Sequence, residues 1–315
     1  MTELRTLGSS DLAVSRLCLG GNVFGWTADA TESFAVLDGY TAAGGNFIDT
    51  ADSYMTRPDN EPGQSERIIG DWLASRGNRD EVVVATKVSN HPDFRGLAPD
   101  TIKGAAEASL RRLGTDRIDL YYTHFDDESV PVSDIITALD ELVRAGKVRA
   151  IAASNISPQR LADSLEFSER EGLARYVALQ PHYNLVSRDT YEGERRDLVE
   201  RAGLGCVPYF ALASGFLTGK YRPGKDVDSV RSEPRLAGRY ADDERGARVL
   251  AALDEVAAAR GAAHATVALA WLAQQPTVVA PIASARSTEQ LPALLAMHDL
   301  TLTAEELRAL DAASA

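Results

Sequence analysis

Short apolar runs alternate with stretches of helical periodicity along almost the whole chain. Each apolar run is bounded by polar or glycine residues and has the length of a buried strand. The expected strands lie near 17–20, 46–50, 82–87, 118–123, 148–153, 177–180, 205–209 and 278–282. The expected helices lie near 31–43, 64–75, 99–113, 132–145, 158–170, 193–202 and 247–260. This alternation is typical of an α/β protein with a parallel sheet.

The ends of the expected helices carry the residues that begin and end helices. Ser157-Pro158 is typical of an N-cap followed by proline at the first helical position. Glycine follows several helices, for example Gly114 and Gly172, where the chain must leave the helix in a left-handed conformation. These signals support the helix boundaries that the periodicity predicts.

Eight strand–helix units in 315 residues predict a single closed (β/α)8 TIM barrel that spans residues 1–315. An amino-terminal hairpin is expected to turn at residues 8–10, and a carboxy-terminal helix at 303–312 begins with the capping box Thr303-Ala304-Glu305-Glu306. Residues 210–246 show no clear periodicity. Because this segment follows the seventh strand, we expect it to be a loop that covers the rim of the barrel.

The composition narrows the class of protein. The formal net charge of −13 argues against nucleic acid or an anionic membrane as the main partner. No apolar run reaches the length of a membrane span, and no signal peptide is visible at the amino terminus. Cys18 and Cys206 are expected to be buried free thiols, and the five histidines show no metal-ligand spacing. We therefore expect a cytoplasmic protein without a metal site.

Ionisable residues end three of the expected strands. Asp49, Lys87 and His124 close the second, third and fourth runs, and Tyr54 follows the aspartate by five positions. In a parallel barrel the carboxyl ends of all strands meet at one rim, which is where such barrels carry out their chemistry. The sequence therefore predicts a site that combines a carboxylate, an ammonium, a phenol and an imidazole.

These four groups suit the protonation of an oxygen that gains negative charge. A free phenol has a pKa near 10, and a neighbouring ammonium lowers that pKa by favouring the phenolate. Asp49 would keep a buried Lys87 charged, and His124 would hydrogen-bond an incoming carbonyl oxygen. Each residue also has an ordinary structural interpretation, as a solvated charge, a cap or a packing group. Their conjunction on successive strand ends favours the chemical interpretation.

Hydride chemistry requires a donor, yet no G-x-G-x-x-G motif follows a strand. The glycine-rich segment 20–25 lacks the lysine of a P-loop and is also compatible with a simple tight turn. Later strand ends offer amide and aromatic groups that can bind a carboxamide and a flat ring, and an arginine that can pair with phosphate. These are Ser154, Asn155, Gln180, Tyr209 and Arg286. A helix cap, a strand-end hydrogen bond and a surface charge remain alternatives for them.

Four segments resemble the signatures of the aldo-keto reductases. They are Gly45–Tyr54, Ser109–Asp116, Gly146–Arg149 together with Ser154-Asn155, and Phe216–Tyr221. The resemblance runs from about Leu4 to Leu310, and the motifs occur in the order of the family. It implies a (β/α)8 barrel that reduces aldehydes and ketones with NADPH, in the manner of general-purpose bacterial reductases.

The resemblance also implies roles for individual residues. Tyr54 would donate the proton, Asp49 and Lys87 would lower its pKa, and His124 would orient the carbonyl, while the pro-R hydride of nicotinamide is transferred. Arg286 would lie near the 2′-phosphate, which favours NADPH over NADH. The full set of implied cofactor-binding residues is Gly21, Asn22, Ser154, Asn155, Gln180, Tyr209, Leu212, Ser214, Lys220, Arg235, Ser284, Arg286 and Gln290.

The chain departs from the family pattern at three places. It reads Tyr209-Phe210-Ala211-Leu212 where relatives often have Tyr-Ser-Pro-Leu, and Ala283-Ser284 where many have Pro-Gly. Leu294 stands where an asparagine often contacts adenine. The departures concern the adenosine end of the cofactor and leave the four catalytic candidates unchanged.

The expected substrate is a small carbonyl compound in an aromatic pocket. Candidate pocket residues are Trp26, Met55 and Phe125, with Phe24, Phe94 and Phe210 on the same rim. One alternative is an NADPH-binding regulatory subunit that resembles the potassium-channel β subunits, although those tend to have asparagine at the position of His124. Another is a dedicated reductase of a keto-sugar or a biosynthetic keto intermediate. The sequence gives no indication of the oligomeric state.

Overall fold

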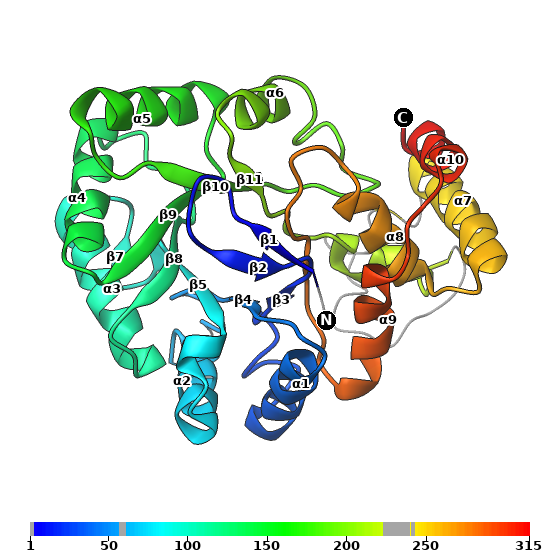
Figure 1. Ribbon diagram of the computed structural model, residues 1–315, viewed down its shortest axis with the longest axis horizontal. Coiled ribbons are helices and arrows are strands. Elements are labelled where there is room, and N and C mark those ends of the chain that lie inside the picture. Colours follow the sequence, from blue (N-terminus) through cyan, green and yellow to red (C-terminus); the bar gives the residue numbers. More distant parts are fainter. Residues whose placement is uncertain (1–2, 57–60, 223–239, 241–242) are drawn as a thin grey trace.

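A curled parallel sheet forms the centre of the molecule. The computed structural model describes residues 3–56, 61–222, 240 and 243–315. In sheet order the strands are β11 (Gly205–Cys206), β10 (Tyr176–Gln180), β9 (Val148–Ser154), β8 (Ile118–Thr123), β5 (Val83–Val88), β4 (Phe47–Asp49), β3 (Cys18–Gly20) and β12 (Ile282–Ala283). Neighbouring strands pair in parallel throughout this order. Figure 1 shows the strands arranged around one axis with helices outside them.

The two ends of this sheet meet and close the barrel. The backbone N–H of Cys206 donates to Thr277 at 2.9 Å, and that of Val279 donates to the carbonyl of Cys206 at 2.8 Å. The N–H of Ile282 donates to Pro208 at 2.9 Å. These bonds join the first and last strands of the described eight-stranded sheet, so the barrel is closed. The predicted (β/α)8 barrel is thereby confirmed, although the eighth strand pairs mainly at 282–283, later than the expected 278–282.

The expected helices form a layer outside the barrel. They are α1 (Ala30–Ala42), α2 (Gln64–Arg76), α3 (Pro99–Leu113), α4 (Val132–Arg144), α5 (Pro158–Glu171), α6 (Glu194–Arg201) and α7 (Glu244–Arg260). Helix α10 (Ala304–Ser314) follows the predicted capping box, in which Thr303 and Glu306 bond to each other's backbone N–H. Figure 1 shows α10 beside α7, although the two are far apart in sequence.

Other elements were not expected from the sequence. Helix α8 (His264–Ala273) is buried from Ala265 to Ala273, so it is apolar on every side and lacks an amphipathic period. The short helix α9 (Leu291–Leu295) and the small hairpin of β6 (Asn90–His91) and β7 (Phe94–Arg95) are additional. Within the described residues no single helix has the length and apolarity of a membrane span; α7 and α8 reach both only as a pair bent by 99°.

A hairpin covers the amino ends of the strands. It consists of β1 (Leu4–Thr6) and β2 (Ala13–Ser15), as the sequence predicts. Arg5 donates through Nη1 to the carbonyl of Val278 at 3.0 Å. Gly8 has a φ of 55°, and a Cβ there would lie 2.0 Å from the carbonyl oxygen of Val177, so only glycine allows this approach. Figure 1 shows the hairpin lying across the barrel, which leaves the carboxyl ends of the strands on the opposite side.

Two apolar layers stabilise the barrel. Residues that point inward, with the underside of the hairpin, form the smaller cluster, and residues between strands and helices form the larger one. Cys18 and Cys206 are both free and buried, as predicted. Most of the predicted lid, residues 223–239 and 241–242, lies outside the described residues. Within the described part of the predicted lid, Ala213–Thr218 form a 3-10 helix, η2.

Candidate active site

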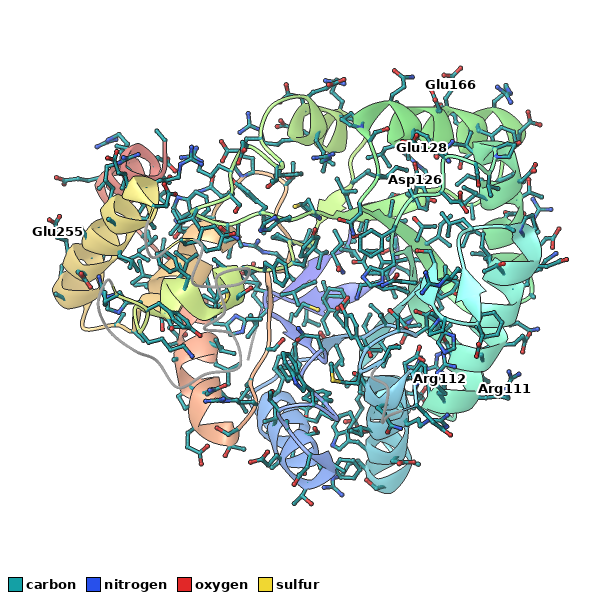
Figure 2. The ribbon with its side chains drawn as sticks, turned by 180° about the vertical axis from the view of Figure 1, so that it is seen from behind. Arg111, Arg112, Asp126, Glu128, Glu166 and Glu255 are labelled. Carbon is teal, nitrogen blue, oxygen red and sulfur yellow. The ribbon has the colours of Figure 1, made fainter. Side chains whose placement is uncertain are left out.

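A cleft of about 710 Å³ lies at the carboxyl ends of the strands. Figure 2 views the molecule from this side, opposite to the hairpin. Tyr54, His124 and Asp49 line the cleft, and Lys87 lies directly beneath them. The structure therefore brings together the three side chains that the sequence placed on separate strand ends and Tyr54 on the loop that follows the first of them.

The ammonium of Lys87 is buried, and all three of its donors are used. Nζ lies 2.6 Å from Oδ2 of Asp49, 2.7 Å from the carbonyl oxygen of Thr50 and 3.2 Å from the hydroxyl of Tyr54. Burial lowers the pKa of Lys87, but the Asp49 carboxylate and Tyr54 raise it by more, so its pKa lies above the ordinary value. Lys87 is therefore charged at neutral pH.

The loop between β4 and α2 is held against β5 by backbone hydrogen bonds, and this fixes Tyr54 beside Lys87. The N–H of Thr50 donates to Ala85 at 2.8 Å, and the N–H of Asp52 donates to Lys87 at 3.3 Å. Tyr54 itself closes a turn, because its N–H donates to Ala51 at 3.2 Å. Backbone bonds of this kind set the position of the phenol more tightly than a free loop would.

The environment of Tyr54 corrects one sequence-based expectation. We expected its neighbours to lower the pKa of the phenol. Burial instead raises the pKa of Tyr54 to about 12, and the Asp49 carboxylate adds to that increase, while Lys87 opposes it. The effect of Lys87 is limited because its charge is already paired with Asp49. The phenol is consequently fully protonated at neutral pH, as a proton donor must be.

His124 stands on the other side of the phenol. Its ring and that of Tyr54 are 6.0 Å apart and nearly perpendicular. Burial, with a smaller effect of Lys87, lowers the pKa of His124 to about 3, so the imidazole is neutral. Its Nδ1 is buried and has no hydrogen-bond partner in the described part of the chain. A neutral imidazole of this kind can hydrogen-bond a ligand without adding a charge.

A chain of hydrogen bonds leads from Asp49 to the amide groups on the next strands. Gln180 donates through Nε2 to Oδ1 of Asp49 at 2.9 Å, and the Ser154 hydroxyl donates to the carbonyl of Gln180 at 2.8 Å. Asn155 donates to Ser154 at 3.0 Å and to the carbonyl of His124 at 2.8 Å. These bonds occupy some of the donors and acceptors that we expected to bind a ligand. They also hold the amide groups in fixed orientations.

Tyr209 completes this wall of the cleft. Its hydroxyl donates to Oδ1 of Asn155 at 2.9 Å, and the ring of His182 stacks on it at 5.4 Å with the planes 16° apart. Because His182 covers one side of the phenol ring, the side toward the cleft is left for a flat ligand. The next residue, Phe210, has a φ of 54°, and Ser214 has a φ of 57°, so the backbone turns sharply here.

The polar residues expected to bind the adenosine part of a cofactor also line the cleft. Ser284 donates to Oδ1 of Asn22 at 2.6 Å, and Gln290 accepts from the backbone N–H of Arg286 at 3.0 Å. The Arg286 guanidinium has no ion pair with any described residue. Leu212, Ser214 and Lys220 also line the cleft. The predicted contact at Arg235 falls outside the described residues.

The structure does not place some predicted residues in the cleft. Gly21 packs against the barrel, where a Cβ would lie 2.8 Å from the Ser65 hydroxyl; its neighbours Gly20 and Asn22 line the cleft instead. Trp26 and Met55, predicted as pocket residues, are not among the lining residues, and neither are Phe24 and Phe94. Phe125 and Phe210 do line it and expose 45 % and 39 % of their surface.

Several lining residues were not predicted from the sequence; most of them present only backbone or small side chains, while Ile282, Glu289 and Leu294 present larger ones. They are Gly20, Val23, Thr27, Ala211, Gly215, Thr218, Ala263, Ala265, Ile282, Ala283, Glu289, Ala293 and Leu294. Of these, Ala211, Ala283 and Leu294 had been noted only as departures from a family pattern. No residue type signals such contacts in a sequence, since they depend on where the chain passes.

The residues present fit a dinucleotide. The cleft offers amide groups and an aromatic ring for a nicotinamide, and Arg286 and Lys220 for phosphates. At Gly20 the backbone lies close to Ser284, because a Cβ at this position would lie 2.6 Å from the Ser284 hydroxyl. In the described parts of the chain, no group of three or more His, Cys, Asp or Glu side chains is arranged to hold a metal ion.

Comparisons with known proteins identify the family of the chain. The model of the aldo/keto reductase family matches residues 16–315. Norsolorinic acid reductase stcV of Emericella nidulans is 35 % identical, over 94 % of this chain and 77 % of its own. The uncharacterized oxidoreductase YrpG of Bacillus subtilis is also 35 % identical, over 98 % and 95 %. Protein tas of Escherichia coli is 31 % identical, over 96 % and 95 %. The chain is therefore an oxidoreductase that belongs to the aldo/keto reductase family.

Proposed function

We propose that this protein reduces an aldehyde or ketone to an alcohol with NADPH, and that Tyr54 donates the proton. The observation that carries the proposal is the hydrogen bond from Lys87 Nζ to the Tyr54 hydroxyl at 3.2 Å. Because the phenol oxygen accepts this bond, its own hydrogen is free to point elsewhere. Tyr54 lines the cleft, so that hydrogen is available to an oxygen bound there.

The neighbouring residues support this role. As the proton leaves Tyr54, the Lys87 ammonium stabilises the phenolate, and Asp49 keeps the ammonium charged and in place. His124, neutral and beside the phenol, would hydrogen-bond the carbonyl oxygen and hold it within reach of the proton. NADPH, when bound, supplies the hydride for the carbonyl carbon.

The polar wall of the cleft would hold the cofactor. Ser154, Asn155 and Gln180 would bind the nicotinamide carboxamide with the donors and acceptors that their internal bonds leave, and Tyr209 would stack on the ring. Phe125 and Phe210 would form apolar sides of the mouth for the substrate.

A screen of carbonyl compounds tests the proposed function. We expect oxidation of NADPH, followed by its absorbance, with one or more of nitrobenzaldehyde, methylglyoxal, keto-sugars and norsolorinic acid, the last because relatives carry the name norsolorinic acid reductase. Turnover of keto-sugars alone would favour a dedicated reductase. Tight NADPH binding without turnover of any compound would instead support a regulatory subunit and contradict the proposal.

Arg286 is expected to select NADPH over NADH. Replacing it with alanine should weaken NADPH binding by about 10-fold or more and change NADH binding less than about twofold, because a charge-assisted bond to a phosphate contributes about 1.5–3 kcal/mol. Fluorescence titration with both dinucleotides measures this. Arg308, an exposed arginine on α10, provides a control when replaced in the same way. Equal weakening of both dinucleotides would show that Arg286 does not contact the 2′-phosphate.

A further inference from the structure

Asp52 is a fully buried carboxyl group that the proposed reaction does not use. It lies on the loop between β4 and α2, two residues before Tyr54, and its exposed fraction is 0 %. Neither of its oxygens makes a hydrogen bond of normal geometry with a described residue. An ionised carboxylate in this position would be costly, because burial removes water and no hydrogen bond of normal geometry from a described residue replaces it.

The cations near Asp52 are already paired with other groups. Glu66 on α2 accepts from Nε of Arg112 at 2.5 Å and from the Thr86 hydroxyl at 2.5 Å. Figure 2 shows Arg112 beside its neighbour Arg111 on α3; Arg112 is the less exposed of the two. Lys87, on β5, is bound to Asp49. Asp52 is therefore a second carboxyl group beside an ion pair that is already balanced.

The surroundings favour the uncharged form of Asp52. Burial and, after it, the Glu66 carboxylate raise the pKa of Asp52 to about 8, while Arg112, Ser53 and Lys87 oppose the increase. The phenol of Tyr121 on β8 and the imidazole of His91 on β6 face the same charged cluster. The pKa values of both groups are shifted toward their neutral forms. At neutral pH, Asp52 is thus mostly a neutral acid in a nearly balanced cluster.

We propose that Asp52 is a positioning residue, which acts through Lys87 and Tyr54 and supports carbonyl reduction only while its carboxyl group is uncharged. The backbone N–H of Asp52 donates to the carbonyl of Lys87 at 3.3 Å, so the residue ties the Tyr54 loop to the strand that carries the ammonium. The inference rests on the proposed role of Tyr54 as proton donor.

Ionisation of Asp52 would disturb the site in two ways. A new carboxylate beside Glu66 would be repelled and would loosen the loop that carries Tyr54. It would also attract Lys87 and weaken the stabilisation of the phenolate that forms as the proton leaves. Both effects lower the rate of carbonyl reduction as the pH rises. Tyr54 itself, with a pKa of about 12, loses its proton only at much higher pH.

The pH dependence of kcat/KM tests the proposal in the whole protein. For a carbonyl substrate and NADPH, we expect kcat/KM of the wild type to fall on the order of tenfold as the pH rises through about 8. A fall of this size corresponds to an increase of about one unit in the pKa of Tyr54 when Asp52 is ionised. Asp52→Asn, which mimics the neutral acid, should keep the neutral-pH rate and lack this fall. Glu66→Gln should move the fall to lower pH, because it removes a charge that raises the pKa of Asp52.

A matched substitution separates this effect from a general loss of charge. Asp71 lies on α2 as an exposed carboxylate, and Asp71→Asn should keep the alkaline fall of the wild type. If Asp52→Asn showed the same fall as the wild type, or lost activity at pH 7 while remaining folded, the proposal would be overturned. A fall that stays unchanged in Glu66→Gln would also contradict it.

Thermal unfolding provides a readout that does not depend on activity. The pKa of Asp52 is raised from 3.8 in the unfolded chain to about 8 in the folded protein. Below pH 3.8, Asp52 is protonated in both the folded and the unfolded protein, so it does not change the free energy of unfolding. As the pH rises from there, the unfolded chain loses this proton more readily than the folded protein, and the folded protein becomes less stable. The loss of stability is complete above the folded pKa of about 8. The Tm of Asp52→Asn relative to the wild type should therefore increase from pH 4 to pH 8.

The two readouts distinguish failure of this inference from failure of the proposed function. A constant Tm difference across that pH range would show that Asp52 is charged in the folded protein and would refute the inference. If no carbonyl compound were reduced, the proposed function would fail, and with it the role of Asp52 in proton donation, whatever the Tm difference showed about its charge.

Discussion

Replacing Tyr54 with phenylalanine is expected to reduce kcat/KM for carbonyl reduction by about 10²- to 10⁴-fold, the usual contribution of a positioned general acid. The substitution removes only the hydroxyl that accepts the bond from Lys87. NADPH binding should change by less than about twofold, because the cofactor contacts proposed above lie on other strands. Steady-state kinetics and fluorescence titration with NADPH measure the two effects separately.

A second phenol serves as the control for Tyr54. Tyr176 on β10 is buried and does not line the cleft, and its hydroxyl makes one long contact, 3.4 Å, with Thr123. Tyr176→Phe should therefore keep kcat/KM close to that of the wild type. Retained turnover in Tyr54→Phe, at the level of this control, would refute the proton-donor role.

Replacing Lys87 with methionine should cost both activity and stability. The change leaves the Asp49 carboxylate buried, with the Gln180 amide as its one side-chain partner among the described residues. Removing one partner of a buried ion pair typically costs about 3–5 kcal/mol in the free energy of unfolding. We also expect carbonyl reduction to fall by at least about 100-fold, because no cation then stabilises the phenolate. Urea unfolding and steady-state kinetics measure these effects.

Two further variants separate the structural and chemical roles of Lys87. The double variant Asp49→Asn with Lys87→Met removes the unpaired charge, so it should recover part of the stability but none of the activity. Lys103 pairs with Glu141 at 3.0 Å on the surface, and Lys103→Met should change the stability by less than about 1 kcal/mol. If Lys87→Met were as active as Lys103→Met, the assigned role of the ammonium would be wrong.

Burial and pKa values could not be obtained from the sequence. The sequence places a lysine and an aspartate near Tyr54, and from those neighbours we expected a lowered pKa. The folded protein raises that pKa to about 12, because desolvation of the phenol outweighs a cation that Asp49 already neutralises. Asp52 was not singled out from the sequence, because the sequence does not show that it is buried. A carboxylate in a loop is ordinary, and only tertiary packing shows that it is buried and that neither oxygen makes a hydrogen bond of normal geometry with a described residue.

The sequence also does not show which side chains form the walls of the cleft. Phe125 and Phe210, which both follow strand ends, line the cleft, whereas Trp26 and Met55 are not among its lining residues. All four are large apolar residues near the rim, so their type does not distinguish them. Helix α8 was missed because burial on every side removes the periodicity by which a helix is recognised.

The sequence by itself determined the order of strands and helices, the closed barrel and the strand ends that carry the reactive groups, because these follow from periodicity and from the rule that parallel strands end at one rim. Tertiary structure alone decided which protons are held, which amide groups are already bonded and which side chains reach the cleft. Those properties depend on distances and on the exclusion of water between segments far apart in the chain, and a linear pattern does not record them.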